Sequence, residues 1–564
     1  MYKKIVFYSF ILVALVSLMT ACKSNLRPLA SDYIKVEPQP LELVAGKVPA
    51  TINATFPANW FNRNATVVVT PVLRYAGGEA WGTSYTFQGE KVAGNGQVIP
   101  QKEGANVTMK SSFDFVPEMR QSELYLTFSA KIGNKQVNLP EVKIGEGVLA
   151  TAGLMDASSE IPAIAPDKFQ RIVKEAHEAD IMFLIQQAEL RSSELRKAEV
   201  TDWQNLVKDA GNAANQNVDV EISAYASPDG AYDLNERLSR QRESNTNRHL
   251  QGQLKNANLS APIAARYTAE DWEGFQKLVE KSNIQDKNLI LNVLSMYKDP
   301  EQREREIKNM SSVFAVLADE ILPQLRRSRL IANVEIIGKS DEEISQLAAS
   351  NPGALNVEEL LYAATLINDL STKESIFQKA TQLFPNDFRA FNNLGVVEFM
   401  KGNLSGAESF FNKALSFGAS PEANMNMGLI SIANGNLDKA QQFLGGAAGL
   451  SEAGSAMGLL DIANGNFSKA AGSFGSTASN NAALAQLLNK DYSSALSTLN
   501  AVSNPNATTS YLKAIIAART NNVENVVSNL KQAIQLDPAK AQKAATDLEF
   551  VKYLTNPDFL SIIR

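Results

Sequence analysis

A serine, an acid and an arginine surround one turn, and their side chains suit the binding of a charged ligand. Ser227 and Asp229 belong to a Ser-Pro-Asp-Gly sequence, and Arg242 follows on the next predicted helix. A guanidinium group is planar and donates two parallel hydrogen bonds to a carboxylate, and the free N–H groups at a helix N-terminus add positive potential. The pattern therefore indicates a site for a carboxylate.

The flanking sequence predicts a strand, a turn and a helix in that order. Apolar and polar residues alternate over residues 218–223, which is the period of a strand with one buried face. Pro228 and Gly230 supply turn chemistry, and Asp233 stands where a helix N-cap is expected. Leucines then form one helical stripe over residues 234–250. These elements would hold the turn and the arginine together.

This arrangement resembles the OmpA-like peptidoglycan-binding family, whose signature continues from a loop into Asn-x-x-Leu-Ser-x-x-Arg on the following helix. The positions that match the family are Gly230, Asn235, Leu238, Ser239 and Arg242. The loop differs, because Ser227 stands where the family has its aspartate. The resemblance extends over roughly residues 33–338, since some outer-membrane lipoproteins of this family carry a preceding β-domain and a helical insertion.

The resemblance implies a ligand. In the family, the loop aspartate meets the ammonium group and the helix arginine meets the carboxylate of diaminopimelate in the wall peptide. Carried over residue by residue, the candidate peptidoglycan-binding residues are Arg242, Asn235, Asp229, Ser227 and Gly230. Two interpretations stay open: Asp229 replaces the missing acid, or Asp229 only closes a tight turn while Arg242 pairs with a neighbouring acid.

The N-terminus resembles a bacterial lipoprotein signal. Two lysines precede an apolar run over residues 5–18, and the run ends in Met-Thr-Ala before Cys22, which is the only cysteine in the chain. The run is shorter than the roughly 20 residues that a membrane span needs. With no second cysteine for a disulfide, lipidation is the obvious use of Cys22. We expect a signal peptide over residues 1–21 and a lipid tether over residues 22–32.

Acylation of Cys22 would anchor the chain firmly, because two or three acyl chains bind a membrane far better than one. Lys23 rather than aspartate follows the cysteine, which by resemblance to the sorting rule favours the outer membrane. No acidic run of the kind that marks surface export follows, so we expect a periplasmic orientation. The alternative is an uncleaved N-terminal anchor.

Composition agrees with a multidomain body on a tether and argues against nucleic acid as a partner. The chain has 564 residues, 45% of them hydrophobic, with a net charge of −6. Nucleic-acid binding needs a concentrated basic face. The basic run at residues 325–329 is short, and we interpret it as a solvated helix end that leads into a strand.

Residues 33–150 predict an all-β sandwich. Short alternating segments such as residues 65–73 and 123–129 are separated by glycine and asparagine turns, with no long helical pattern between them. Trp60, Trp81 and Tyr85 are aromatic, and such residues form either a core or, less often, a sugar-stacking surface.

A linker is expected over residues 151–174, followed by the α/β OmpA-like domain over residues 175–338. Its predicted elements are a strand at 181–185, a helix at 194–210, a strand at 218–225, a helix at 235–254, a strand near 264–267 and a last strand at 331–337. Charged helical sequence is inserted at about residues 268–325 and has the alternating charges of a solvated helix face. A second linker is expected over residues 339–353.

The last part, residues 354–564, predicts an all-α repeat solenoid. Gly-Asn pairs recur at Gly402, Gly435 and Gly465, with periods of 33 and then 30 residues. Each pair would end one helix in the left-handed conformation before the next helix begins. These units resemble tetratricopeptide repeats (TPRs), of which we expect six, the unit around residues 478–505 being shortened. The concave face of such a solenoid is the usual docking surface for extended peptides or protein partners.

The sequence contains no recognisable catalytic motif. His177 and His249 are the only histidines, neither lies in a metal-spaced cluster, and no nucleophile elbow, P-loop or dinucleotide motif occurs. A hydrolase with paired carboxylates needs no fixed spacing and is the remaining enzymatic alternative. We expect no enzyme activity, no cofactor and no metal.

The sequence predicts an outer-membrane lipoprotein on the periplasmic side that tethers the membrane to peptidoglycan through its OmpA-like domain and recruits periplasmic or outer-membrane proteins through its TPR groove. The alternative is an adaptor subunit of an outer-membrane assembly or secretion complex, in which the OmpA-like domain no longer binds peptidoglycan. Ser227 keeps this alternative open.

Overall fold

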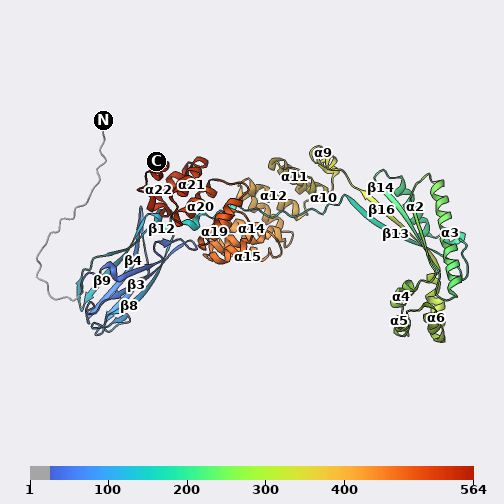
Figure 1. The fold of residues 1–564 in the computed structure, drawn as a ribbon, viewed down its shortest axis with the longest axis horizontal. Helices are drawn as coiled ribbons and strands as arrows, with labels where there is room; N and C mark the ends of the chain where they lie inside the picture. The colour runs from blue at the N-terminus through green and yellow to red at the C-terminus, as the bar shows by residue number, and fades with distance from the viewer. Residues whose placement is uncertain (1–25) are drawn as a thin grey trace. The chain divides into compact units, whose positions relative to one another are not determined.

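The computed structural model describes residues 26–564, which form two compact units (Figure 1). The first unit combines residues 26–166 with Asp369–Arg564, and the second is Asp167–Asn368. The predicted signal peptide and the predicted lipidation site Cys22 lie outside the described residues. Within residues 26–564, none of the helices combines the length and the apolar character that crossing a bilayer requires.

The β-rich N-terminal region that the sequence predicts is confirmed in the first unit. Two sheets, ordered β1-β3-β8 and β10-β9-β4-β6-β7, enclose one apolar core, while β11 pairs with β9, β5 with β4, and β12 with β2. The strands are β1 (Ile34–Glu37), β2 (Leu41–Glu42), β3 (Lys47–Phe56), β4 (Ala65–Tyr75), β5 (Gly78–Trp81), β6 (Tyr85–Gly89), β7 (Gln97–Ile99), β8 (Ala105–Asp114), β9 (Ser122–Ile132), β10 (Lys135–Val137), β11 (Val142–Glu146) and β12 (Val148–Leu149). Single 3-10 turns lie at η1 (Ser31–Tyr33) and η2 (Pro117–Arg120).

Alternating side chains build this sandwich. Along β3 every second residue from Val48 to Phe56 is buried, and β8 shows the same alternation. Successive side chains of a strand point to opposite faces, so one face of each strand is left for the core. The core is aromatic at one end, where Phe56 packs against Trp60, Phe61 and Phe87.

The repeat array occupies the rest of the first unit. Its helices are α11 (Leu370–Leu383), α12 (Phe388–Met400), α13 (Leu404–Leu415), α14 (Pro421–Ala433), α15 (Leu437–Gly445), α16 (Ala453–Ala463), α17 (Phe467–Phe474), α18 (Asn480–Leu488), α19 (Tyr492–Ala501), α20 (Ala507–Arg519), α21 (Val523–Leu536), α22 (Ala539–Thr546) and α23 (Pro557–Ile563), with the 3-10 helix η6 (Leu548–Tyr553). Consecutive helices from α12 to α21 pack as hairpins. The predicted helical repeat region is therefore confirmed.

The Gly-Asn pairs act at both ends of a helix. Gly402, Gly435 and Gly465 have φ angles of +81°, +72° and +76°, which is the left-handed conformation that favours glycine. In two of the three pairs the next residue also caps the following helix: Asn403 accepts a hydrogen bond from the N–H of Gly406, and Asn436 accepts one from the N–H of Lys439. Asn466 is the N-cap of α17 but makes no such bond. Lys490 takes the same conformation at +66° before Asp491, the N-cap of α19.

Three other glycines set the distance between paired helices. Gly395, Gly428 and Gly458 lie on α12, α14 and α16 with the same 33- and 30-residue spacing as the turns. A Cβ at these positions would lie 2.6, 2.5 and 2.6 Å from side-chain atoms of Phe411, Leu444 and Phe474 on the partner helices. The hairpins are therefore too close for any larger residue.

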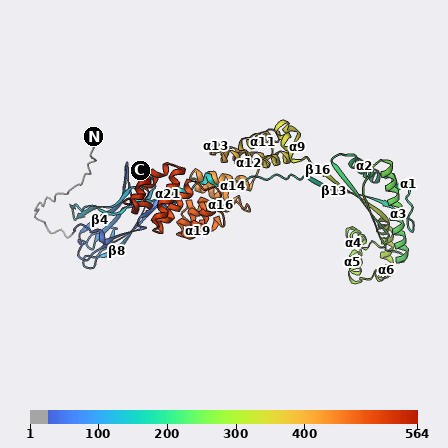
Figure 2. The ribbon, with the colours of Figure 1, turned by 45° about the horizontal axis from the view of Figure 1, so that its top comes forward.

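Residues 151–166 are not a free linker, contrary to the expectation from sequence. They begin with η3 (Thr151–Leu154) and η4 (Ala157–Ser159) and continue as an extended segment without regular secondary structure, which hydrogen-bonds to helices of the array. Figure 2 shows this cyan segment beside α14. The prediction failed because small and polar residues with two prolines are typical of a linker, whereas here array side chains bind the backbone.

The second unit has a four-stranded sheet in the order β13-β16-β14-β15. β16 is antiparallel to both of its neighbours, and β14 and β15 are parallel. The strands are β13 (Ile172–Met182), β14 (Gln216–Tyr225), β15 (Ile263–Thr268) and β16 (Arg327–Ile337). The helices are α1 (Ser192–Leu195), α2 (Ala198–Asn212), α3 (Tyr232–Asn256), α4 (Trp272–Lys281), α5 (Lys287–Met296), α6 (Pro300–Asn309), α7 (Ser311–Glu320), α8 (Leu322–Leu325), α9 (Asp341–Ser350) and α10 (Val357–Thr365), with η5 (Pro352–Ala354).

Helices cover one face of this sheet. Apolar residues of β13, β14 and β16 form a core with α2 and α3, while α4 to α8 form a separate small core that lies where the insertion is expected. Figure 1 shows α2 and α3 along the sheet and α4, α5 and α6 at one end of it. The other face of the sheet is left for polar side chains.

Several local predictions need correction in the second unit. The first strand begins at Ile172, earlier than expected, because β13 pairs with β16 along its whole length. Helix α3 begins earlier than expected, so its N-cap is Ala231 and not Asp233, which lies in the first turn. The predicted linker at residues 339–353 contains α9, which packs against α10, so α10 belongs to this unit and not to the array.

We expect Gly458→Ala to destabilise the array by about 1–3 kcal/mol, because the new methyl group would overpack against Phe474. Gly472→Ala on α17 is the matched control, since a Cβ there meets nothing within 4 Å. The control should be neutral or slightly stabilising, because alanine favours helix over glycine. Urea denaturation followed by circular dichroism measures both. Equal midpoints for the two variants would contradict the packing argument.

Candidate functional site

The turn between β14 and α3 brings the predicted site residues into one polar network. The hydroxyl of Ser227 donates to Asp229 Oδ1 at 2.5 Å, and Asn235 Nδ2 donates to the carbonyl of Gly230 at 2.9 Å. Ser227 and Asn235 are both buried, each with 4% exposure. The amide of Asn235 therefore holds the turn that contains the serine and the acid.

Arg326 completes this network, and sequence reasoning missed it. Its Nη2 lies 3.0 Å from Asp229 Oδ2, and its Nε donates to Ser227 Oγ at 3.1 Å. The two charged side chains are only 11% and 16% exposed. Asp229 is thus already paired with a cation of the protein itself. In the family, the cation that meets the loop acid is the ammonium group of the wall peptide.

Arg242 lies deep in the unit, with 1% of its surface exposed. Its Nε donates to the carbonyl of Gln187 at 2.9 Å, its Nη1 to that of Tyr225 at 2.7 Å, and its Nη2 to that of Leu184 at 3.3 Å. The guanidinium also lies over the ring of Phe183, 5.0 Å from its centroid. Arg242 therefore binds backbone from two separate segments to α3.

Burial and the nearby charge of Arg326 lower the pKa of Arg242 to about 10, so the guanidinium stays protonated at neutral pH. A buried cation needs hydrogen-bond acceptors, and the three carbonyls provide them. With only 1% of its surface exposed, Arg242 presents no accessible donor to a ligand carboxylate. Arg242 therefore holds three backbone carbonyls in place, and we call this arrangement the Arg242 clamp.

The uncovered face of the sheet and α4 border a polar cleft of about 800 Å³. Arg327 and Arg329 of the basic run at residues 325–329 line this cleft, so they are not the solvated helix end that we expected. Arg327 pairs with Asp271 at 2.9 Å, with both side chains 7% exposed, and Arg329 pairs with Asp180 at 3.2 Å. Their alternate spacing on β16 places both arginines on the same face. These charges neutralise each other.

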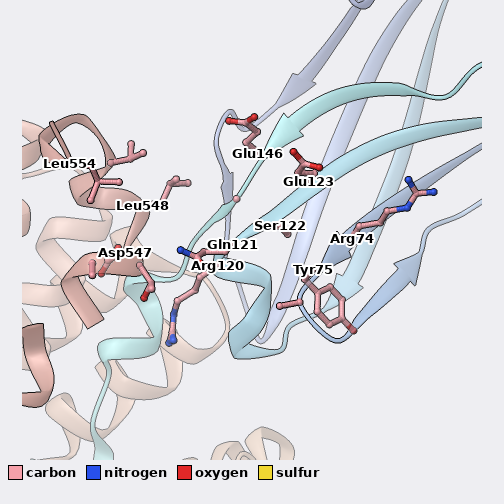
Figure 3. Close-up of a pocket in the computed structure, with 15 residues that line it drawn as sticks. Arg74, Tyr75, Arg120, Gln121, Ser122, Glu123, Glu146, Asp547, Leu548 and Leu554 are labelled. Carbon is pink, nitrogen blue, oxygen red and sulfur yellow. The ribbon is translucent and has the colours of Figure 1, made fainter. Parts of the chain in front are cut away.

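A second pocket, of about 550 Å³, lies in the first unit between the β-sandwich and the end of the array (Figure 3). Arg74 and Glu123 belong to its strand side, and Asp547 and Leu548 belong to its array side. Arg74 pairs with Glu141 at 2.7 Å, and the Tyr511 hydroxyl donates to Asp547 Oδ2 at 2.7 Å. Burial raises the pKa of Asp547. Each of these two polar pairs lies within its own side of the pocket, Arg74–Glu141 in the sandwich and Tyr511–Asp547 in the array.

The aromatic residues of the β-domain do not share a surface. Trp60 is buried in the core, Tyr85 is half-buried with its hydroxyl bonded to the backbone of Lys110, and Trp81 is 59% exposed. Of the two possibilities, the core position applies to Trp60. The sugar-stacking surface is not assembled.

Four buried asparagines on the inner helices of the array bind the extended segment, and we call them the asparagine face. They are Asn392 and Asn393 on α12, Asn426 on α14 and Asn481 on α18, each no more than 2% exposed. Sequence reasoning missed them. The signal was present, because Asn393 and Asn426 are 33 residues apart and each precedes a packing glycine, Gly395 or Gly428, by two positions.

Each of three asparagines pairs with both backbone groups of a single residue. Asn393 accepts from the N–H of Ala165 at 2.8 Å and donates to its carbonyl at 2.9 Å. Asn426 does the same with Ala163 at 2.7 and 2.8 Å. Asn481 pairs with Asp156 at 3.0 and 2.8 Å. The docking surface expected to receive partner peptides is therefore occupied by the chain itself.

Comparisons with known proteins identify no family. No protein-family model matches the chain, and no curated protein matches it. Among solved structures, it is similar to a tetratricopeptide repeat protein from Parabacteroides merdae with a TM-score of 0.29 and 16% identity, covering 37% of this chain and 91% of that one. It is also similar to PilF of Pseudomonas aeruginosa, with a TM-score of 0.28 and 17% identity, covering 36% of this chain and 98% of that one. A third similar structure is YrrB, a TPR protein with an unusual peptide-binding site, with a TM-score of 0.22 and 20% identity, covering 36% of this chain and 98% of that one.

TM-scores this low carry no argument about function. The helical hairpins, their period of about 30 residues and their glycine turns make the C-terminal region a TPR-type array on its own geometry. Within residues 26–564, no group of three or more His, Cys, Asp or Glu side chains is placed to hold a metal ion.

We expect Arg242→Ala to destabilise the second unit by about 3 kcal/mol or more, because it leaves three buried carbonyls without donors and each costs roughly 1–3 kcal/mol. Arg242→Lys should fall short of full rescue, since one ammonium cannot reach all three carbonyls. The control is Arg240→Ala, two residues away on the exposed face of α3, where an i,i+4 pair with Glu236 is removed. Chemical denaturation measures all three variants. A loss at Arg240 as large as at Arg242 would contradict the clamp.

Proposed function

We propose that this protein is an outer-membrane lipoprotein that works as a non-catalytic structural adaptor, and that its second unit keeps an OmpA-like architecture without binding peptidoglycan through Arg242. The observation that carries the proposal is the burial of Arg242 with its three carbonyl acceptors. Of the two functions that the sequence suggests, this geometry favours the adaptor over the wall tether.

The loop chemistry supports the same choice. A zwitterionic ligand needs an accessible acid and an accessible cation. Asp229 is paired with Arg326, and Ser227 stands at the position of the family's aspartate and hydrogen-bonds to both. The order β13-β16-β14-β15 with α2 and α3 on one face supports the OmpA-like architecture. We therefore infer that the second unit keeps the OmpA-like architecture without keeping the family's ligand site.

The adaptor role takes further support from the modular build of the chain. An array of helical hairpins offers a long surface that suits protein partners better than a small substrate. In the polar cleft of the second unit, Arg327 is paired with Asp271 and Arg329 with Asp180. An assembly function explains these features without a reaction.

Sedimentation with purified peptidoglycan sacculi tests the loss of wall binding. The wild-type chain should stay in the supernatant to the same extent as serum albumin, because Arg242 is buried and out of reach of a ligand. Co-sedimentation that free diaminopimelate reverses would overturn the proposal and establish the wall tether. An OmpA-like domain that binds sacculi serves as the positive control.

Membrane anchoring rests on Cys22 and is tested separately. Cells that express the wild-type chain should incorporate labelled palmitate into it and retain it in the outer-membrane fraction. Cys22→Ser should abolish labelling, because serine cannot form the thioether, and should release the chain from that fraction if the signal is cleaved. Retention of Cys22→Ser in the membrane at wild-type levels would instead indicate an uncleaved N-terminal anchor.

A further inference from the structure

The extended segment makes contacts that belong to a ligand more than to a connection between domains. Ala157, Ala163 and Ala165 are 5%, 3% and 1% exposed, whereas Ile161 and Ile164 are 77% and 51% exposed. The small side chains thus face the array and the large apolar ones face away from it. A plain linker would bury its large apolar residues first.

The contacts recognise the backbone. An asparagine side chain carries both a donor and an acceptor, so one amide can pair with the N–H and the carbonyl of the same residue. Asn393, Asn426 and Asn481 each make this two-point contact. Any extended peptide offers the same groups, and the buried alanines restrict only the size of its side chains.

The asparagines are also joined to each other. Asn426 donates to Asn392 Oδ1 at 3.0 Å, and Asn392 donates to the carbonyl of Ala163 at 3.0 Å and to Asn393 Oδ1 at 3.1 Å. A buried amide without a partner is costly, so this row of amides is complete only with a peptide or water on it.

We propose that the asparagine face is a peptide-binding site, that residues 156–166 are its built-in ligand, and that this ligand keeps the site closed to extended peptides of other proteins. The partner class is an extended peptide with small side chains at alternate positions, as in Ala-Ile-Ala-Pro. The inference deepens the adaptor role proposed above, but it depends on neither the lipid anchor nor the second unit.

Tethering explains why the site stays closed. The segment is covalently continuous with both units, so its effective concentration at the asparagine face is in the millimolar range or above. A free peptide competes only if the built-in ligand is weakened. Glu160 provides a natural weak point, because its carboxylate is buried beside Asn481 with Asp156 nearby, and burial raises its pKa.

The test uses the full-length chain without its signal peptide and a fluorescein-labelled synthetic peptide with the sequence of residues 154–167. Ala163→Glu/Ala165→Glu should eject the segment, because neither site has room for a glutamate. This variant should bind the peptide at least tenfold more tightly than the wild type in fluorescence anisotropy. Adding Asn393→Ala and Asn426→Ala should abolish that binding.

The matched control is Ile161→Glu/Ile164→Glu, which makes the same substitution in the same segment at exposed positions. It should bind the peptide as weakly as the wild type does. Equal binding by the wild type and the Ala163/Ala165 variant would overturn the proposal, as would binding by neither. Sacculi and membranes play no part in this assay, so its failure is distinct from failure of the adaptor's anchoring.

Hydrogen exchange keeps the proposal testable if the glutamate variant does not fold. The amides of residues 163 and 165 should be protected in the wild type and should exchange at least tenfold faster in Asn393→Ala/Asn426→Ala. Asn412→Ala, at an exposed position on α13, should leave them protected. Glu160→Gln should slow their exchange, because it removes the buried charge. Unprotected amides in the wild type would show that the segment is not a bound ligand.

Discussion

The need of a buried backbone for hydrogen-bond partners organises the first unit. An extended segment that crosses a helical array has no neighbouring strand to pair with, so its N–H and carbonyl groups would be left without partners. The asparagine face supplies those partners from side chains at Asn393, Asn426 and Asn481. This pairing fixes the segment to the array, and the β-sandwich, the segment and the array form one compact unit, even though 202 residues separate Pro166 from Asp369.

The second unit interrupts the first unit in the sequence. The second unit, Asp167–Asn368, is inserted between a ligand and its binding site, both of which belong to the first unit. Its two connections to the first unit therefore leave from the end of the bound segment and from the start of α11. A partner that displaces the segment would also release one of these two connections. Access to the asparagine face and the attachment of the second unit are thus linked by chain connectivity.

Local patterns in the sequence predicted the elements but not their long-range partners. Alternation located β4 and β14, and the Gly-Asn period located the helix ends at Gly402, Gly435 and Gly465. The roles of Arg326 and Asn481 were missed, because their partners Asp229 and Asp156 lie 97 and 325 positions away. The N-cap was assigned to Asp233 although α3 begins one residue before it, because a cap depends on the backbone angles at Ala231. Residues 151–166 have linker composition, and only the array shows that they are bound.

Arg242 and the asparagine face differ in whether another group can replace their hydrogen-bond partners. Arg242 is a buried cation, and removing its carbonyl acceptors would leave a charge in an apolar surrounding, which is far more costly than an unpaired neutral group. It therefore belongs to the fold and is poorly suited to exchange its partners for a ligand. The asparagines are neutral, and water or another peptide can satisfy the same amide groups at similar free energy. Exchange of ligands is thus chemically reasonable at the asparagine face and unfavourable at Arg242. Sequence motifs marked Arg242 as a binding residue, but its hydrogen-bond partners are fixed. The segment that resembled a linker covers the asparagine face, where a bound peptide can be exchanged.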